Sequence, residues 1–211
     1  GTVSFDDLSF TGPKPSQPPP RFYGTVSITN SDESRSIPAP DGYTVCARIG
    51  DEERGSCQVL SGEYGPLDVS GEQGDTICFY VQGLDTGQTA EWKAGESTEL
   101  NLTVVDNEPP SMPTNVSRTT PPSNNTPCFT WDAATDVLAD VAGYSIGIDD
   151  ADWTWIGNVT SWTSPHPTPD GNHTFFVKAI DKVGNEGEAG QADFSIDTTP
   201  PSMPTNVHKA T

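Results

Sequence analysis

The stretch Pro-Pro-Ser-Met-Pro-Thr-Asn-Val occurs twice in the chain, at Pro109–Val116 and at Pro200–Val207. The copies begin about 90 residues apart, which is close to the length of one small domain. An aspartate stands three positions before each copy, Asp106 before the first and Asp197 before the second. A run repeated at this spacing marks the boundary of a structural unit rather than a catalytic motif. We therefore expect the second copy to begin a further unit.

Between these boundaries the sequence predicts an all-β protein. Its 211 residues include 20 glycines and 20 prolines, with 32% hydrophobic residues. Short runs rich in Val, Ile, Thr and aromatic residues alternate with turn residues, and no segment has a sustained period of 3.6. We expect strands at Phe22–Thr29, Tyr43–Ile49, Gly55–Leu60, Thr76–Gln82, Gln88–Trp92 and Thr98–Val105. The fold class predicted is two tandem Ig-like β-sandwich domains with extended terminal strands and Pro-rich linkers.

Four segments follow from this pattern. Residues 1–20 are expected to form an N-terminal strand and a polyproline linker, and residues 21–106 a first β-sandwich. Residues 107–197 are expected to form a second β-sandwich. Residues 198–211 would be a linker followed by the first strand of a next unit, or a strand donated to a neighbouring subunit.

The charge of the chain excludes two classes of partner. With 30 acidic residues against 10 basic ones, the net charge is −20. Such a surface repels nucleic acid and anionic membranes, and no apolar run reaches the roughly 18 residues of a membrane span. A solvated surface, adaptation to high salt and binding of divalent cations each account for the acidity, and the sequence leaves these alternatives open.

Cysteines and glycosylation sequons favour an exported protein. Cys46, Cys57, Cys78 and Cys128 form no Cys-x-x-Cys motif and have no histidine at ligand spacing, so metal, haem and thiol-redox readings fail. By strand alternation, Cys46, Cys78 and Cys128 point outward and Cys57 inward. Asn-x-Ser/Thr sequons predict glycosylation sites. They stand at Asn101, Asn115, Asn124, Asn158 and Asn172.

The first domain resembles a known module. Phe22–Val26, Gly50–Gly55 and Gly74–Val81 resemble a β-sandwich repeated in archaeal and bacterial cell-surface proteins. That module is similar to carboxypeptidase-regulatory-like and transthyretin-like sandwiches. The resemblance implies that the strands of Cys46 and Cys78 are neighbours, which makes Cys46–Cys78 the preferred disulfide among three possible complete pairings. Members of this family usually lack cysteines at the matching positions.

The second domain resembles the Ig-like or fibronectin type III-like repeats of bacterial and archaeal adhesins and secreted enzymes. The resemblance rests on Thr126–Asp136, Val141–Ile146 and Asp170–Asn185. Where fibronectin domains often carry a corner tyrosine, this chain has Phe175, so the hydroxyl hydrogen bond of that corner is absent. Such folds carry many functions, so the resemblance implies fold rather than ligand.

No enzyme motif is found. The three histidines fall in different segments, no Gly-x-Ser-x-Gly occurs, and Asp149, Asp150 and Asp152 fit a solvated hairpin turn. Calcium at the domain junctions is the alternative, because it takes six to eight oxygen ligands. The candidate ligands are Asp106, Asn107, Glu108, Asp181, Asn185 and Asp197.

Three tryptophans lie within ten residues, at Trp153, Trp155 and Trp162. Trp153 and Trp155 should face the same side of a strand. We expect this group to cover the sandwich core or an interface, with carbohydrate binding as the alternative.

These observations predict an extracellular, non-enzymatic structural protein of a cell-surface filament, stalk or surface layer, without a cofactor. It would self-associate or contact neighbouring domains of an array, with short Pro-stiffened linkers between sandwiches. The terminal segments would assemble by strand addition, through Val3 and Phe5 at one end and Thr205 and Val207 at the other. The alternatives are an adhesin or carbohydrate-binding accessory module, and a passive spacer.

Overall fold

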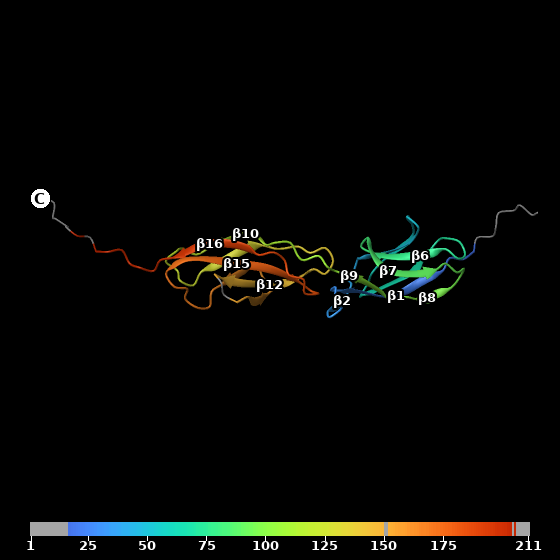
Figure 1. The fold of residues 1–211 in the computed structure, drawn as a ribbon, viewed down its shortest axis with the longest axis horizontal. Coiled ribbons are helices and arrows are strands. Elements are labelled where there is room, and N and C mark those ends of the chain that lie inside the picture. Colours follow the sequence, from blue (N-terminus) through green and yellow to red (C-terminus); the bar gives the residue numbers. More distant parts are fainter. Residues whose placement is uncertain (1–16, 150–151, 204, 206–211) are drawn as a thin grey trace, which may run out of the picture. The chain divides into compact units, whose positions relative to one another are not determined.

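The computed structural model describes residues 17–149, 152–203 and 205, and these form β-strands joined by turns and loops (Figure 1). The described chain divides into two compact units. The first contains residues 17–26 and 38–104, and the second contains residues 27–37 and 105–203 with residue 205. None of the described residues belongs to an apolar helix long enough to cross a membrane.

Two sheets form the first sandwich, and the ends of its strands at residues 27–29, 36–37 and 105 are counted with the second unit. Its strands are β1 (Arg21–Thr29), β2 (Ser36–Pro38), β3 (Thr44–Ile49), β4 (Glu52–Gln58), β5 (Glu63–Asp68), β6 (Thr76–Val81), β7 (Leu84–Glu91), β8 (Ser97–Glu99) and β9 (Leu102–Val105). One sheet has the order β2-β1-β5, with β8 and β9 also paired to β1, and the other has the order β4-β3-β6-β7. Phe22 on β1 and Phe79 on β6 meet edge to face at 5.1 Å, so the two sheets enclose one core.

Most expected strands of this unit are confirmed, but β2 and β5 are absent from the sequence prediction, and the expected strand Thr98–Val105 is divided into β8 and β9. β2 and β8 are three residues long, and β5 contains Gly65 and Pro66, which are turn signals in sequence. The Gly50–Asp51 turn joins β3 to β4, and Gly50 has a φ of 61°, which favours glycine.

The predicted Cys46–Cys78 disulfide is not present, and all four cysteines are free thiols. Strands β3 and β6 are neighbours, as expected, but their register pairs Cys46 with Tyr80 and Arg48 with Cys78. The two cysteines are therefore diagonal neighbours on the same face. Diagonal Cα positions lie roughly 7–8 Å apart, which is too far for a disulfide without movement of the backbone.

The second unit is also a sandwich. Its strands are β10 (Thr114–Arg118), β11 (Cys128–Asp132), β12 (Val141–Ile148), β13 (Thr154–Gly157), β14 (Ser161–Thr163), β15 (Gly171–Asp181) and β16 (Gly190–Ile196). One sheet has the order β10-β11-β14 and the other β13-β12-β15-β16. The sheets meet at Phe129 of β11 and Phe175 of β15, whose rings stack at 4.0 Å. Trp131 and Tyr144 extend this core with an edge contact at 5.6 Å.

The 11-residue strand β15 organises the second unit. It pairs with β12 from Val141–Asp181 to Ile148–Phe175, and with β16 from Gly171–Ile196 to Val177–Gly190. Alternate residues of β15 are buried, and Phe175 is fully buried where a corner tyrosine was considered. Asp181 is the last residue of β15, so its carboxylate lies at the end of the two central strands of the sheet, β12 and β15.

The terminal predictions have a mixed outcome. Val3, Phe5 and Val207 lie outside the described residues. Thr205 is described as an exposed bend and belongs to no strand. Residues 17–20, expected to be linker, attach to the first unit, because Pro18 O accepts a bond from Gly95 N and Pro20 O accepts one from Val69 N.

Candidate functional site

Three carboxylates converge at one end of the second unit. Asp106 follows β9, Asp136 lies in the loop between β11 and β12, and Asp181 ends β15. One oxygen of each lies within 4.8 Å of one oxygen of each of the others. Asp106 and Asp181 are 2% and 1% exposed, and Asp136 is half-buried. We call these three residues the acidic cluster.

Backbone amides hold two members of the acidic cluster in place. Oδ1 of Asp181 accepts bonds from the N–H groups of Val183 and Asn185, both at 2.9 Å, within the turn between β15 and β16. Oδ1 of Asp136 accepts bonds from Leu138 N at 2.9 Å and Ala139 N at 2.7 Å. These bonds fix the position of each carboxyl group.

Asp106 is less well satisfied. Its Oδ1 accepts one bond from Glu108 N at 3.1 Å, while its buried Oδ2 has no partner among the described residues. Burial is the main cause that raises the pKa of Asp106 to about 6, and the charges of Asp136 and Asp181 add to it. The N–H groups of Glu108 and Ala139 oppose this rise. A buried carboxylate oxygen without a donor beside two other acids is unfavourable for the metal-free protein.

Asn185 connects two members of the acidic cluster. Its Nδ2 donates to Asp181 Oδ2 at 2.8 Å and to the backbone oxygen of Asp106 at 3.1 Å. The N–H of Asp106 in turn donates to Thr29 O at 2.7 Å. The segment that follows β9 is thus bonded both to the β15–β16 turn and to residue 29 of the same unit.

The basic residues nearby do not neutralise the acidic cluster. Within the described part of the chain, no lysine, arginine or histidine forms an ion pair with any of the three carboxylates. Lys182 pairs instead with Asp140 at 2.7 Å. The guanidinium of Arg35 lies against Gly184. The cluster therefore carries up to three uncompensated negative charges, and its chemistry suits a hard cation with oxygen ligands. Asp106 is too buried to contact a substrate.

The repeated motif is attached to the same unit. Ser111 N donates to Thr135 O, and Thr135 N donates to Ser111 Oγ, both at 2.9 Å. A Cβ atom at position 187 would lie 2.5 Å from the carbonyl oxygen of Pro110, which is too close for any residue but glycine. The Pro113 oxygen lies even closer to the corresponding position at Gly190. Both glycines are therefore required for the motif to approach β16.

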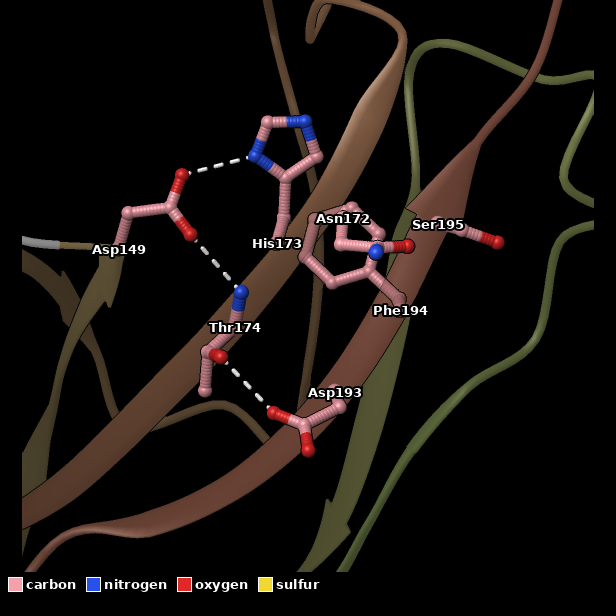
Figure 2. Close-up of a pocket in the computed structure, with 7 residues that line it drawn as sticks. All are labelled: Asp149, Asn172, His173, Thr174, Asp193, Phe194 and Ser195. Atoms are coloured by element: carbon pink, nitrogen blue, oxygen red, sulfur yellow. Dashed lines mark hydrogen bonds and ion pairs between the residues drawn. The ribbon is translucent and has the colours of Figure 1, made fainter.

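A second, open hollow lies along β15 and β16 (Figure 2). His173 Nδ1 lies 2.8 Å from Asp149 Oδ2, and its Nε2 lies 3.0 Å from Pro169 O. Both partners are acceptors, so the doubly protonated imidazolium fits best, and the hydrogen bond to Asp149 is the main cause that raises the pKa of His173. The Thr174 hydroxyl donates to Asp193 rather than to His173. The residues that line this hollow thus contain no hydroxyl nucleophile bonded to the histidine.

Asp149 lies in an exposed turn, as predicted, and its carboxylate also accepts a bond from Thr174 N at 2.8 Å. Asp149 therefore ties the end of β12 to β15. Asp150 lies outside the described residues, and Asp152 is exposed.

The core part of the tryptophan prediction holds for one residue of three, and the interface part stays a prediction. Trp162 is half-buried and stacks on Phe175 at 5.9 Å. Trp153 and Trp155 are 44% and 52% exposed, so they do not cover the core. Lys178 Nζ lies 4.3 Å from the centre of the Trp153 ring. Trp155 lies on β13, an edge strand of its sheet, and Trp153 directly precedes that strand.

The sequons lie at the surface, and glycosylation stays a prediction. Four of the five asparagines are exposed, and Asn124 is half-buried. The Nδ2 of Asn115 donates to Asp132 Oδ2 at 2.6 Å, so a glycan there would replace this bond. Cys57 faces the core side with its partner Val45, and Cys128 alternates with buried Phe129, as the strand phase predicted.

The calcium alternative named Asp106 and Asp181 but omitted Asp136, and four of its six residues do not belong to the acidic cluster. One of these four, Asn185, is bonded to the cluster. Asp197 is exposed in the described structure, and Asn107 and Glu108 lie outside the cluster. Asp136 is absent from the prediction because its loop is distant in sequence from both other carboxylates. Its Asp-x-Leu-Ala context, in which the side chain caps two backbone amides, is the signal that marks an ordered loop aspartate.

Comparison with known proteins gives structural likenesses only. No protein-family model and no curated protein matches the chain. A solved structure of fibronectin(III)-like modules of CbhA from Clostridium thermocellum is 14% identical, with a TM-score of 0.37, and the match covers 88% of this chain and 95% of that one.

Two further solved structures give similar values. FN3tt is 17% identical with a TM-score of 0.35, over 44% of this chain and 99% of that one. The spore cortex lytic enzyme SleM of Clostridium perfringens is 16% identical with a TM-score of 0.36, over 65% of this chain and 35% of that one. With TM-scores this low, the architecture is established by the strand pairing itself.

Proposed function

We propose that the chain is a non-catalytic structural segment of an exported, multidomain surface protein, in which serial β-sandwiches are joined by an anchored connector. The connector is residues 106–113, between β9 and β10. The observation that carries this proposal is the attachment of the connector to the second unit by hydrogen bonds at Asp106 and Ser111. A flexible spacer would have a solvated, unpaired backbone at these positions.

The sequence repeat supports a serial arrangement. Asp197 repeats the local geometry of Asp106, because its Oδ1 accepts a bond from Thr199 N, just as Asp106 Oδ1 accepts one from Glu108 N. The backbone N–H of each aspartate also donates to a carbonyl oxygen, Thr29 O for Asp106 and Pro122 O for Asp197. The chain therefore leaves each sandwich in the same local conformation, as expected for a repeated connector.

Hydrogen–deuterium exchange of the full chain tests the anchored connector. We expect the amides of Asp106 and Ser111 to exchange slowly, because both are hydrogen-bonded. Gly190→Val should release the connector, since its Cβ would collide with the carbonyl of Pro113. Glu188→Val is the matched control, at an exposed position two residues earlier in the loop that leads into β16. Exchange of both amides at the unprotected rate in the unsubstituted chain would contradict the proposal.

The finer proposal is a filament, stalk or surface-layer subunit, which requires self-association. Analytical ultracentrifugation of the full chain at several concentrations separates it from a passive spacer. Association that rises with concentration supports assembly, whereas a strictly monomeric profile supports the spacer. The acidic surface makes association sensitive to salt, so the measurement belongs at physiological ionic strength and above.

A glycan-binding module is the second candidate, and the exposed pair Trp153 and Trp155 favours it. Two exposed indoles on one side of an edge strand form a surface on which a sugar ring can stack. A glycan array with the full chain and with Trp155→Ala tests this candidate. Retention of any binding signal in the variant, or no signal in the full chain, would dismiss it.

A further inference from the structure

We propose that the acidic cluster of Asp106, Asp136 and Asp181 is a calcium-binding site. This site stands whether or not the modules assemble. The cluster alone would not carry the proposal, because acidic residues gather on many surfaces. A second observation does: Asp106 is 2% exposed, and its Oδ2 points at no hydrogen-bond donor among the described residues. A buried carboxylate oxygen of this kind needs a positive partner.

The spacing of the carboxylate oxygens in the cluster suits a bound metal cation. The carboxylate oxygens approach within 4.8 Å of one another, a separation that two oxygens bound to the same calcium ion at 2.3–2.6 Å readily have. Backbone amides bond to Oδ1 of Asp136 and Oδ1 of Asp181 and orient the two side chains. Oδ2 of Asp181 accepts the Asn185 amide alone, so it keeps a lone pair for a cation. No basic side chain of the described residues forms an ion pair with the cluster.

The donor set favours calcium over other metal ions. All three side chains offer oxygen, and no histidine or cysteine belongs to the cluster, which disfavours zinc and copper. Magnesium requires near-ideal octahedral geometry and keeps most of its waters. Two of the three carboxylates are almost fully buried on different elements, so a larger ion that accepts irregular coordination fits better.

Asn185 and the backbone of Asp106 supply further oxygen atoms close to the cluster. The Asn185 amide is bonded to Asp181 Oδ2 and to Asp106 O through its nitrogen. Rotation of this amide by half a turn would present its oxygen instead. The side-chain oxygen of Thr29, whose carbonyl accepts from Asp106 N, is also buried and without a partner among the described residues. Waters would complete the six to eight ligands.

A calcium ion here would join three separate parts of the second unit: the start of the connector, the β11–β12 loop and the β15–β16 turn. The connector is already hydrogen-bonded to this unit, and the ion would add a charge-based attachment that depends on calcium concentration. Extracellular calcium modules bind with Kd values of about 10⁻⁴–10⁻³ M. The site would therefore be filled at millimolar calcium and empty after chelation.

Isothermal titration calorimetry and thermal unfolding of the full chain test the site. The protein is treated with EDTA, dialysed, and titrated with CaCl₂ at pH 7 and 150 mM salt, which screens diffuse binding to the acidic surface. We expect one saturable site per chain and, at 10 mM Ca²⁺, a rise in the Tm of the second unit of roughly 5–10 °C. MgCl₂ at the same concentration should give a clearly smaller rise.

Two variants and one control locate the site. Asp106→Asn and Asp136→Asn should lose the saturable binding and the Tm rise while their circular dichroism stays that of the unsubstituted chain. Asp197→Asn is the matched control. It removes the exposed acid that precedes the second copy of the motif, whose side chain accepts the same kind of turn bond, from Thr199 N. The control should keep both responses.

Three outcomes would overturn the proposal. They are no saturable binding up to 10 mM Ca²⁺, equal responses to Ca²⁺ and Mg²⁺, and a calcium response that folded Asp106→Asn or Asp136→Asn retains in full. The exchange experiment on the connector is read in EDTA. If the connector amides are protected but no calcium binds, only the calcium site is dismissed. If calcium binds but the connector amides are unprotected, only the proposed function is dismissed.

Discussion

Replacing Asp106 by asparagine should stabilise the calcium-free protein at neutral pH, although it removes a buried polar contact partner. The substitution preserves the shape of the side chain, and its Oδ1 can still accept the bond from Glu108 N. It removes the charge that faces Asp136 and Asp181 across the acidic cluster. Most substitutions of buried residues destabilise, so the sign of this effect is a sharp test of the electrostatics.

The magnitude follows from the pKa of Asp106, which burial and the two neighbouring acids raise from 3.8 to about 6. If the whole rise acts on stability, ionising Asp106 at pH 7 costs the folded state roughly 3 kcal/mol. Relaxation of the loops reduces this value, and we expect a gain of about 1–3 kcal/mol for the variant. Because the folded-state pKa is raised, the favourable contribution is complete below pH 3.8 and is lost as the pH rises through 6.

Urea unfolding in EDTA measures this gain. Four of the five tryptophans lie in the second unit, so fluorescence reports mainly on the unit that carries the acidic cluster. The stability difference between Asp106→Asn and the unsubstituted chain should be small at pH 4 and grow to its full value by pH 7. Taking the difference cancels the titration of the other acidic residues.

Two controls make the result decisive. Asp197→Asn removes the same charge from an exposed position, and its effect should stay within about 0.5 kcal/mol at each pH, as for most surface substitutions. Addition of 10 mM Ca²⁺ should reverse the order, so that the unsubstituted chain gains stability and Asp106→Asn does not. A variant that is less stable than the unsubstituted chain in EDTA at pH 7, or a difference independent of pH, would refute the reasoning.

Three further predictions concern the second unit. Phe175→Ala should lower the free energy of unfolding by about 3–5 kcal/mol, because it leaves a cavity beside Phe129 and removes a ring stack; chemical denaturation measures this, and a loss below 1 kcal/mol would contradict the packing. The stability advantage of the unsubstituted chain over His173→Gln should be complete below pH 6.5 and decline as the pH rises through the raised pKa of His173, since only the imidazolium donates to both acceptors, one of them Asp149. The difference between the denaturation midpoints of the two chains should therefore be larger at pH 5.5 than at pH 8.5. The same difference at both pH values would dismiss the bond. Asn185→Asp should tighten calcium binding in calorimetry and lower the Tm in EDTA, because it adds a fourth acid to the cluster; weaker binding would argue against Asn185 as a ligand.

The sandwich fold and its inward faces were predictable from local sequence. Strand alternation correctly placed Cys57 on the face of Val45, and Cys46 and Cys78 together on the other face. It did not predict that the outward-pointing Cys46 is buried while Cys57 is only half-buried. The same alternation could not show that Cys46 faces Tyr80 rather than Cys78, because register depends on the turns and bulges between strands. The disulfide prediction failed for that reason alone.

The exposure of the three tryptophans also could not be predicted from the local sequence pattern. Trp153, Trp155 and Trp162 have similar sequence surroundings, and yet only Trp162 packs on Phe175. Both β13 and β14 are edge strands of their sheets, so the difference lies in which side chain turns toward the core, as Trp162 does. Position within a sheet is a property of the whole domain.

The sequence by itself determined the class of the fold, the repeat and the aspartate that precedes each copy of the motif, because these depend on side-chain periodicity, turn residues and identity between segments. Only the tertiary structure decided that Asp106 is buried beside Asp136 and Asp181 and that Asp197 is exposed in the described residues. The two aspartates have the same local context. Their difference comes from the loops that fold around the first, and carboxylates brought together across long stretches of chain leave no periodic signal in the sequence.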